Sequence, residues 1–146
     1  MSVALWLGIM ACFALVVAPA AFGALDREAA GRLVSAIFPR YYLIGAVLGA
    51  LALAALIAHR VRAAGRSLDW LPLALVLLML AFTLCAWLVV LPAAHAAREA
   101  MRRAPPALAQ VEAPGFARLH RLSTILNGAV MLAGAAFVAL EAARRP

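Results

Sequence analysis

Three polar side chains share one face of a long apolar segment near the C-terminus. His120, Ser123 and Asn127 recur at intervals of three and four residues within the stretch FARLHRLSTILN. At ~100° per residue, this spacing places them on one stripe of a helix. Such a stripe can line a path for protons or a small solute, because histidine changes its charge near neutral pH. The alternative reading is that the three side chains form hydrogen bonds to neighbouring helices and hold a bundle together.

Further polar residues are expected at the same end of the molecule. Arg27 and Glu28 follow the first long apolar segment, and Arg98 follows the third. If each apolar segment crosses a membrane, the connections after the first and third crossings lie on one side, together with the start of the fourth. Arg98 can pair there with Glu28 or Glu99. The candidate polar cluster is therefore His120, Ser123, Asn127, Arg98, Arg27 and Glu28.

The sequence carries no motif for catalysis or for metal binding. It lacks a G-x-S-x-G element, a glycine-rich phosphate loop and a nucleophile–base pair, so we assign no catalytic residues and do not expect an enzyme. Cys12 and Cys85 lie in apolar runs without a C-x-x-C pair. A haem held by two histidines would need His95 with His120, because His59 falls on the other side. That reading is weaker, and we predict no metal and no cofactor.

The composition indicates a membrane protein. Apolar residues make up 68% of the chain and the mean hydropathy is +1.02, whereas soluble domains are about 45–50% apolar. A water-soluble chain of 146 residues could not bury this much apolar surface. The net charge is +7 and every basic residue is arginine, placed at the ends of apolar runs. Membrane proteins keep arginine there, so the expected partner is the lipid bilayer and not a nucleic acid.

Four apolar segments are long enough to cross ~30 Å of hydrocarbon. The sequence therefore predicts an all-α membrane protein, a four-helix transmembrane bundle in a single domain covering residues 1–146. The predicted spans are at about residues 3–24, 41–58, 70–91 and 122–140.

The connections between the spans have distinct patterns. Residues 25–40 are amphipathic, which predicts a short interfacial helix between spans one and two, in the headgroup plane or extending the second span. Pro39 disfavours helix at the residue before it, so a break or kink is expected there. Ser67 or Asp69 is expected to cap the third span. Three prolines in residues 104–114 predict a loop.

Aromatic and small residues indicate how the spans are placed and packed. Trp6, Tyr41 and Tyr42 are expected at the membrane interface, where such rings concentrate. Gly45 and Gly49 form a G-x-x-x-G pattern that lets helix backbones approach closely. This pattern marks a packing face, within one molecule or between two copies.

Three stretches carry a resemblance to a known family. They are FALVVAPAAFGALDREAAGRLVSAIFPRYY, AWLVVLPAAHAAREA and FARLHRLSTILN. Through them nearly the whole chain resembles the transmembrane protein 205-like family of small multi-pass membrane proteins, which has no established reaction. The resemblance implies four spans. It directs attention to Phe22, Gly31, Phe38, Pro39, Tyr41, Pro92, His120, Ser123 and Asn127. In the first stretch, Pro19 is expected to kink the far end of the first span.

The arginines predict an orientation. The connections after spans one and three hold eight arginines and the opposite side holds five. Four spans place both termini on the same side, and arginine counting predicts that this side is extracytoplasmic. The Ala, Arg and Leu bias of the composition indicates a bacterial protein, so the expected membrane is the bacterial inner membrane.

Two functions remain open from the sequence. The first is transport or permeability for a small solute or ion through the polar cluster, with a homo-oligomer because four spans enclose little space. The second is a structural or assembly subunit that packs against another membrane protein.

Overall fold

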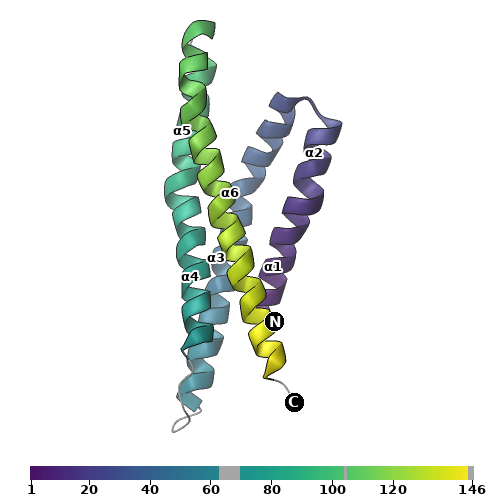
Figure 1. Cartoon of the computed structure of the whole chain (residues 1–146), viewed down its shortest axis with the longest axis vertical. Coiled ribbons are helices and arrows are strands. Elements are labelled where there is room, and N and C mark those ends of the chain that lie inside the picture. Colours follow the sequence, from purple (N-terminus) through teal and green to yellow (C-terminus); the bar gives the residue numbers. More distant parts are fainter. Residues whose placement is uncertain (63–69, 104, 145–146) are drawn as a thin grey trace.

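The described part of the chain contains four long helices, and Figure 1 shows that they form a bundle. The computed structural model describes residues 1–62, 70–103 and 105–144, and for residues 106–113 only the backbone. The elements in order are α1 (Ser2–Cys12), η1 (Phe13–Val17), α2 (Ala18–Ala24), α3 (Arg27–Arg62), α4 (Leu71–Cys85), η2 (Ala86–Val90), α5 (Leu91–Arg103) and α6 (Pro106–Ala143), where η marks a π-helical segment. Four stretches are long and apolar enough to cross a membrane: Ser2–Ala24, Arg27–Arg62, Leu71–Arg103 and Pro114–Ala143. The predicted all-α, four-span architecture is confirmed.

The amphipathic segment before the second span is not a separate helix. It forms the first part of α3, which continues through Pro39 to Arg62. The start of α3 is capped by Asp26, whose Oδ1 accepts the backbone N–H groups of Glu28 at 3.0 Å and Ala29 at 2.9 Å. Pro39 removes one backbone donor without breaking the helix, as proline does inside packed membrane helices. The predicted break at Pro39 is therefore wrong.

The predicted loop between the third and fourth spans is also largely helical. Helix α6 begins at Pro106 and includes Pro114. Proline suits the first turn of a helix, because the N–H that it lacks has no intrahelical partner there. Residue 104 and the predicted caps Ser67 and Asp69 lie outside the described residues.

The spanning helices pack in a ring. Helix α1 contacts α3 and α6, and α4 contacts the same two helices, so α3 and α6 lie across from one another. At the far end, α2, which continues the helix of α1 and η1, packs on α3, and α5, which continues the helix of α4 and η2, packs on α6. Figure 1 shows both termini at one end of the bundle, and α2 diverging from α5 and α6 at the other.

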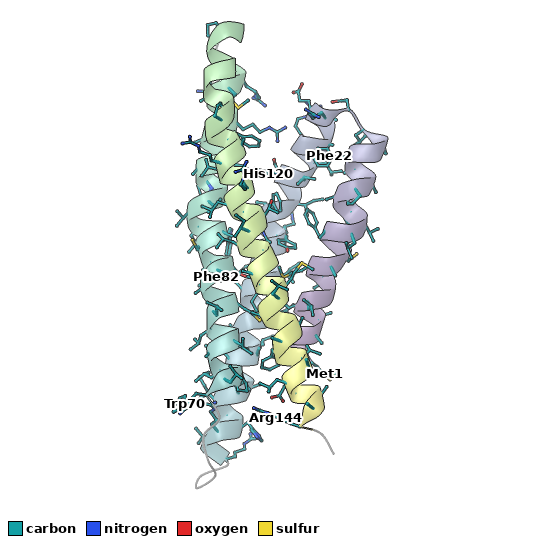
Figure 2. The ribbon with its side chains drawn as sticks, in the orientation of Figure 1. Met1, Phe22, Trp70, Phe82, His120 and Arg144 are labelled. Carbon is teal, nitrogen blue, oxygen red and sulfur yellow. The ribbon has the colours of Figure 1, made fainter. Side chains whose placement is uncertain are left out.

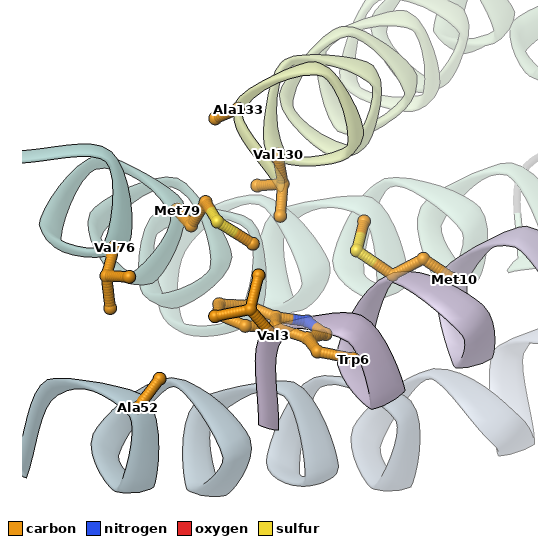
Figure 3. Close-up of a cluster of buried hydrophobic side chains, with 8 residues drawn as sticks. All are labelled: Val3, Trp6, Met10, Ala52, Val76, Met79, Val130 and Ala133. Atoms are coloured by element: carbon orange, nitrogen blue, oxygen red, sulfur yellow. The ribbon is translucent and has the colours of Figure 1, made fainter. Parts of the chain in front are cut away.

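The buried core lies in the half of the bundle near the termini (Figure 3). Trp6 of α1 is 2% exposed. A Cβ atom added at Gly45 would lie 2.8 Å from Nε1 of Trp6, and one added at Gly49 would lie 2.9 Å from Cζ3 of the same ring. The G-x-x-x-G face therefore receives the Trp6 ring within one molecule. Trp6 is buried in the bundle because two glycines leave a space that its large ring fills, and its place at the membrane interface stays a prediction.

The first and third spans share a motif. Residues 12–21, CFALVVAPAA, and residues 85–94, CAWLVVLPAA, are identical at seven of ten positions. In each copy a π-helical segment comes shortly before the proline, Pro19 or Pro92, and a backbone N–H bonds to the carbonyl five residues earlier. The wider turn accommodates the donor that the proline lacks.

The shared motif extends to the packing of the two spans. The buried residues of α1 are Val3, Trp6 and Met10, and the residues 73 positions later, Val76, Met79 and Thr83, are the buried ones at the matching places in α4. In the ring, α1 and α4 each contact α3 and α6. The bundle therefore consists of two helical hairpins, α1–α3 and α4–α6, that occupy equivalent places in it.

Candidate functional site

A cavity lies between the two hairpins at the end away from the termini. Its volume is about 470 Å³, within the range of about 300–1,000 Å³ typical of small-molecule sites. We call it the inter-hairpin cavity. It is lined by Phe22 of α2; Arg27, Gly31, Val34, Ser35 and Phe38 of α3; Val90 of η2; Leu91, Ala94, His95, Arg98 and Met101 of α5; and Phe116, Leu119, His120 and Ser123 of α6.

Arg98 joins the two hairpins across this cavity. Its Nη1 donates to the carbonyl oxygen of Gly31 at 2.7 Å and to Oγ of Ser35 at 2.8 Å. Its Nη2 donates to the carbonyl oxygen of Glu28 at 3.4 Å. All three acceptors are neutral, so these bonds hold the guanidinium in place without neutralising its charge.

Gly31 lets the guanidinium lie against the backbone of α3. A Cβ atom at this position would lie 2.6 Å from Nη2 of Arg98 and 3.2 Å from its Cζ. Any other residue would push Arg98 away from the carbonyl groups that it contacts. The hydroxyl of Ser35 also donates to the carbonyl of Gly31, at 2.7 Å.

The acidic residues that were expected to pair with Arg98 are bound elsewhere. Glu28 pairs with Arg32 at 2.7 Å. Glu99 pairs with its neighbours on α5, Arg102 at 3.1 Å and Arg103 at 2.8 Å. The ion pair of Arg98 with Glu28 or Glu99, which the sequence allows, is therefore not formed, because helical neighbours three or four residues away are closer.

The lining of the cavity is positively charged. It contains two arginines, Arg27 and Arg98, and no aspartate or glutamate among the side chains that the structure describes. The remaining walls are mostly aliphatic and aromatic. Arg27 is exposed and Arg98 is half-buried, so the positive charge of this lining attracts anions.

The two histidines that a haem would need line the same cavity, one from α5 and one from α6. His95 and His120 both belong to its wall, and the ring of Phe116 stacks on His120 with 6.3 Å between centroids. Figure 2 shows Phe22 and His120 near this end of the bundle. Within the described ranges, no three His, Cys, Asp or Glu side chains come together to hold a metal ion.

A hydrogen-bond network lies between the cavity and the core. The hydroxyl of Tyr41 donates to Oδ1 of Asn127 at 3.1 Å, and Nδ2 of Asn127 donates to the hydroxyl of Tyr42 at 3.0 Å. The hydroxyls of Tyr42 and Ser123 are 3.1 Å apart and share a hydrogen bond. These long side chains connect α3 to α6 across the ring.

The network corrects the predicted place of the tyrosines. Tyr42 is 2% exposed and lies inside the bundle, not in an interfacial belt. Phe38, on the cavity wall, stacks on Tyr42 with 5.7 Å between ring centroids. Phe13 contacts Phe38 at 5.4 Å and Tyr41 at 5.1 Å. This aromatic layer closes the inner end of the cavity.

The structure divides the predicted site residues into three groups. Those lining the cavity are Arg27, Arg98, His120, Ser123, Phe22, Gly31 and Phe38, and Glu28 contributes its carbonyl oxygen. Asn127 and Tyr41 belong to the network below. Gly45 and Gly49 lie further away, against Trp6, and the three prolines Pro19, Pro39 and Pro92 lie within the spanning helices.

Two functional positions were missed or misread from the sequence. Ser35, which holds Arg98, was not singled out, although it follows Gly31 by one helical turn. Tyr42 was assigned to the interface. Its spacing of three and seven residues from Gly45 and Gly49 puts it on the same helical face as those buried glycines, which was the available signal.

Together, the fold and the cavity define a four-span helical membrane protein with a positively charged site between two hairpins. A family model for a domain of unknown function, DUF4149, matches residues 1–103, and the chain belongs to this family. The match covers α1 to α5, whereas α6 lies beyond it. No curated protein and no solved structure matches the chain.

Proposed function

We propose that this protein is a small transport or permeability protein for an anionic solute, with the inter-hairpin cavity as its solute site. The observation that carries the proposal is the position of Arg98, a cation without an acidic partner among the described residues, in a cavity between two equivalent hairpins. Transporters built from repeats place their substrate sites at the interface of the repeats.

Movement of a solute past the cavity requires the hairpins to separate. Beyond the aromatic layer the bundle is tightly packed, with Trp6 and Met10 each 2% exposed and Met79 fully buried. The π-helical segments η1 and η2 lie beside this region in both hairpins, and such segments with a nearby proline are points where helices bend. Bending at η1 and η2 would open the bundle while the ends near the termini stay packed. A homo-oligomer would support such motion.

We further propose a bacterial inner-membrane location with both termini extracytoplasmic, supported by eight arginines on one side and five on the other. The likeness to the transmembrane protein 205-like family remains part of this proposal, and it is supported by the three stretches named above. Neither proposal requires a catalytic step, a cofactor or a metal.

The alternative is a structural or assembly subunit that packs on another membrane protein. The hydrogen-bond network favours it, because Ser123 and Asn127, two of the three residues on the polar stripe, hold α3 to α6. Under this alternative the cavity is a gap that a partner helix or lipid fills, and the polar stripe serves stability alone.

Flux measurements with the purified protein separate the two functions. Proteoliposomes would be tested with three probes: chloride, inorganic phosphate and a fluorescent anionic lysolipid. We expect flux of at least one probe above protein-free liposomes, lowered at least tenfold by Arg98→Gln and unchanged by Thr124→Val, whose hydroxyl bonds only to its own helix. Absence of flux for all three probes with the folded wild-type protein would overturn transport and favour the structural role.

A further inference from the structure

We infer that the inter-hairpin cavity binds an anionic amphiphile: a single-chain molecule whose phosphate or carboxylate head contacts Arg98 and whose tail lies among the apolar walls. This inference rests on the proposed function, since it names the substrate class of the same cavity. It also makes a claim about binding that can be tested without any flux measurement.

The head group is assigned from the donors that Arg98 has left. Arginine carries five N–H donors, and the described residues accept three hydrogen bonds, two from Nη1 and one from Nη2. The Nε–H and one Nη2–H remain. Nε and Nη2 form one edge of the guanidinium, and this edge can bind a carboxylate or phosphate with two parallel hydrogen bonds. Arg27 of α3 also lines the cavity and adds a second positive charge.

The tail is assigned from the rest of the lining. Below the arginines the walls are formed by Val34, Phe38, Val90, Leu91 and Leu119, all apolar. A small hydrated anion would contact Arg98 and leave these walls without a partner. An attached hydrocarbon chain removes apolar surface from water at about 25 cal/mol for each Å² buried, so it adds affinity that inorganic phosphate lacks.

The route of entry also fits a lipid-like molecule. Helix α2 packs on α3, whereas α6 packs on α1, α4, η2 and α5. Phe22 of α2 and His120 of α6 nevertheless line the same cavity. Figure 1 shows the ribbons of α2 and α6 diverging at this end. The cavity is therefore bordered by two helices that do not pack together there, and their outer surfaces face lipid. A molecule dissolved in one leaflet can enter between them.

Native mass spectrometry of the protein in zwitterionic micelles tests this inference. The probes are dodecyl phosphate, dodecanol and inorganic phosphate at equal concentration. We expect a one-to-one complex with dodecyl phosphate, and at least tenfold weaker binding of dodecanol, which lacks the charge, and of inorganic phosphate, which lacks the tail. Equal binding of dodecanol would show a purely apolar cavity, and tight binding of inorganic phosphate alone would show a free-anion site. Either result overturns the inference.

Two variants and one control locate the site. Arg98→Gln should weaken dodecyl phosphate binding at least tenfold, and Gly31→Ala should weaken it several-fold, because the added Cβ displaces the guanidinium while the charge is retained. Arg32→Gln removes the same charge from the exposed face of α3, where Arg32 pairs with Glu28, and should leave binding unchanged. If Arg32→Gln weakens binding as much as Arg98→Gln, the interaction is a general charge effect and the site is wrong.

The binding experiment and the flux experiment test separate claims, so a negative result in one does not decide the other. Flux of chloride or phosphate without binding of dodecyl phosphate would leave the transport proposal standing and overturn the amphiphile. Specific binding of dodecyl phosphate without flux of any probe would overturn the transport proposal and leave the amphiphile inference standing. If Arg98→Gln does not fold, the comparison of the three probes on the wild-type protein still decides the question.

Discussion

The packing of Trp6 on α3 predicts the effect of adding one methyl group to Gly49. In Gly49→Ala the new Cβ would lie 2.9 Å from Cζ3 of Trp6 and 3.0 Å from Cδ1 of Leu80. Trp6 is 2% exposed, and Gly45 confines the other part of its indole ring, so the ring has little room to move. Overpacking of this kind costs about 1–3 kcal/mol of folding free energy.

Gly128→Ala is the matched control, because a Cβ atom at that position has no atom within 4 Å. Both glycines lie inside spanning helices, and alanine gains about 1 kcal/mol of helix propensity over glycine at each. This gain cancels when the two variants are compared. Gly49→Ala should therefore be about 1–3 kcal/mol less stable than Gly128→Ala. Reversible unfolding in mixed micelles, with the fraction of SDS as the denaturant, measures this difference.

Two results would refute the reasoning. Equal stability of the two variants would mean that Trp6 does not occupy the glycine face. Loss of a dimer from Gly49→Ala in mild detergent, with the monomer as stable as Gly128→Ala, would assign the G-x-x-x-G pattern to contacts between copies. As a further check, the difference should shrink in a Trp6→Phe background, since the smaller ring leaves space for the added methyl group.

Two further predictions concern hydrogen bonds. In a double-mutant cycle on the free energy of unfolding, Tyr41→Phe and Asn127→Leu should show a coupling energy of about 0.6 kcal/mol, the average for such bonds in membrane proteins. The control Thr124→Val should couple to neither variant. A coupling energy of zero between Tyr41→Phe and Asn127→Leu contradicts the network. The N–H groups of Ala29 and Glu28 hold the pKa of Asp26 below its ordinary value. The cap is therefore fully stabilising above the pKa of the unfolded chain and is lost as pH falls through the lower folded value. Asp26→Asn should remove this acid dependence of the unfolding midpoint, and an unchanged dependence would show that other groups cause it.

The architecture could be predicted because lipid restricts the choices. A chain crossing hydrocarbon must satisfy its backbone hydrogen bonds internally, so long apolar runs become helices. The four spans follow from this rule alone. The same rule explains the failed break at Pro39: helix continuity in a packed span outweighs the local preference of the residue before a proline, and α3 continues for 36 residues.

The aromatic residues were harder to place, because two principles compete for them. Interfacial belts attract Trp and Tyr, but the spacing of the small residues decided their positions here. Trp6 fills the space above Gly45 and Gly49, and Tyr42 shares the face of those glycines. Helical register was therefore a better guide than residue type.

The partners of Arg98 could not be derived from the sequence. Pairing rules consider side chains, whereas Arg98 uses two backbone carbonyls that are reachable because position 31 has no side chain. The sequence brings Arg98 to the same end of the bundle as Glu28. Only the three-dimensional structure shows that the acid side chain turns to Arg32 and leaves Arg98 with neutral acceptors.

The repeat shows how equivalent positions of the first and third spans carry different side chains at the cavity. By the correspondence of the first and third spans, Phe22 matches His95 and Leu25 matches Arg98. The two hairpins thus offer equivalent positions, but one supplies an aromatic wall and the other an imidazole and a guanidinium. In the first hairpin the helix ends at Ala24, whereas in the second it continues to Arg103 and carries Arg98 to Gly31. A symmetric frame with divergent residues therefore places His95 and Arg98 in the cavity without a matching pair in the first span, and the charge that the first hairpin adds comes from Arg27 of α3.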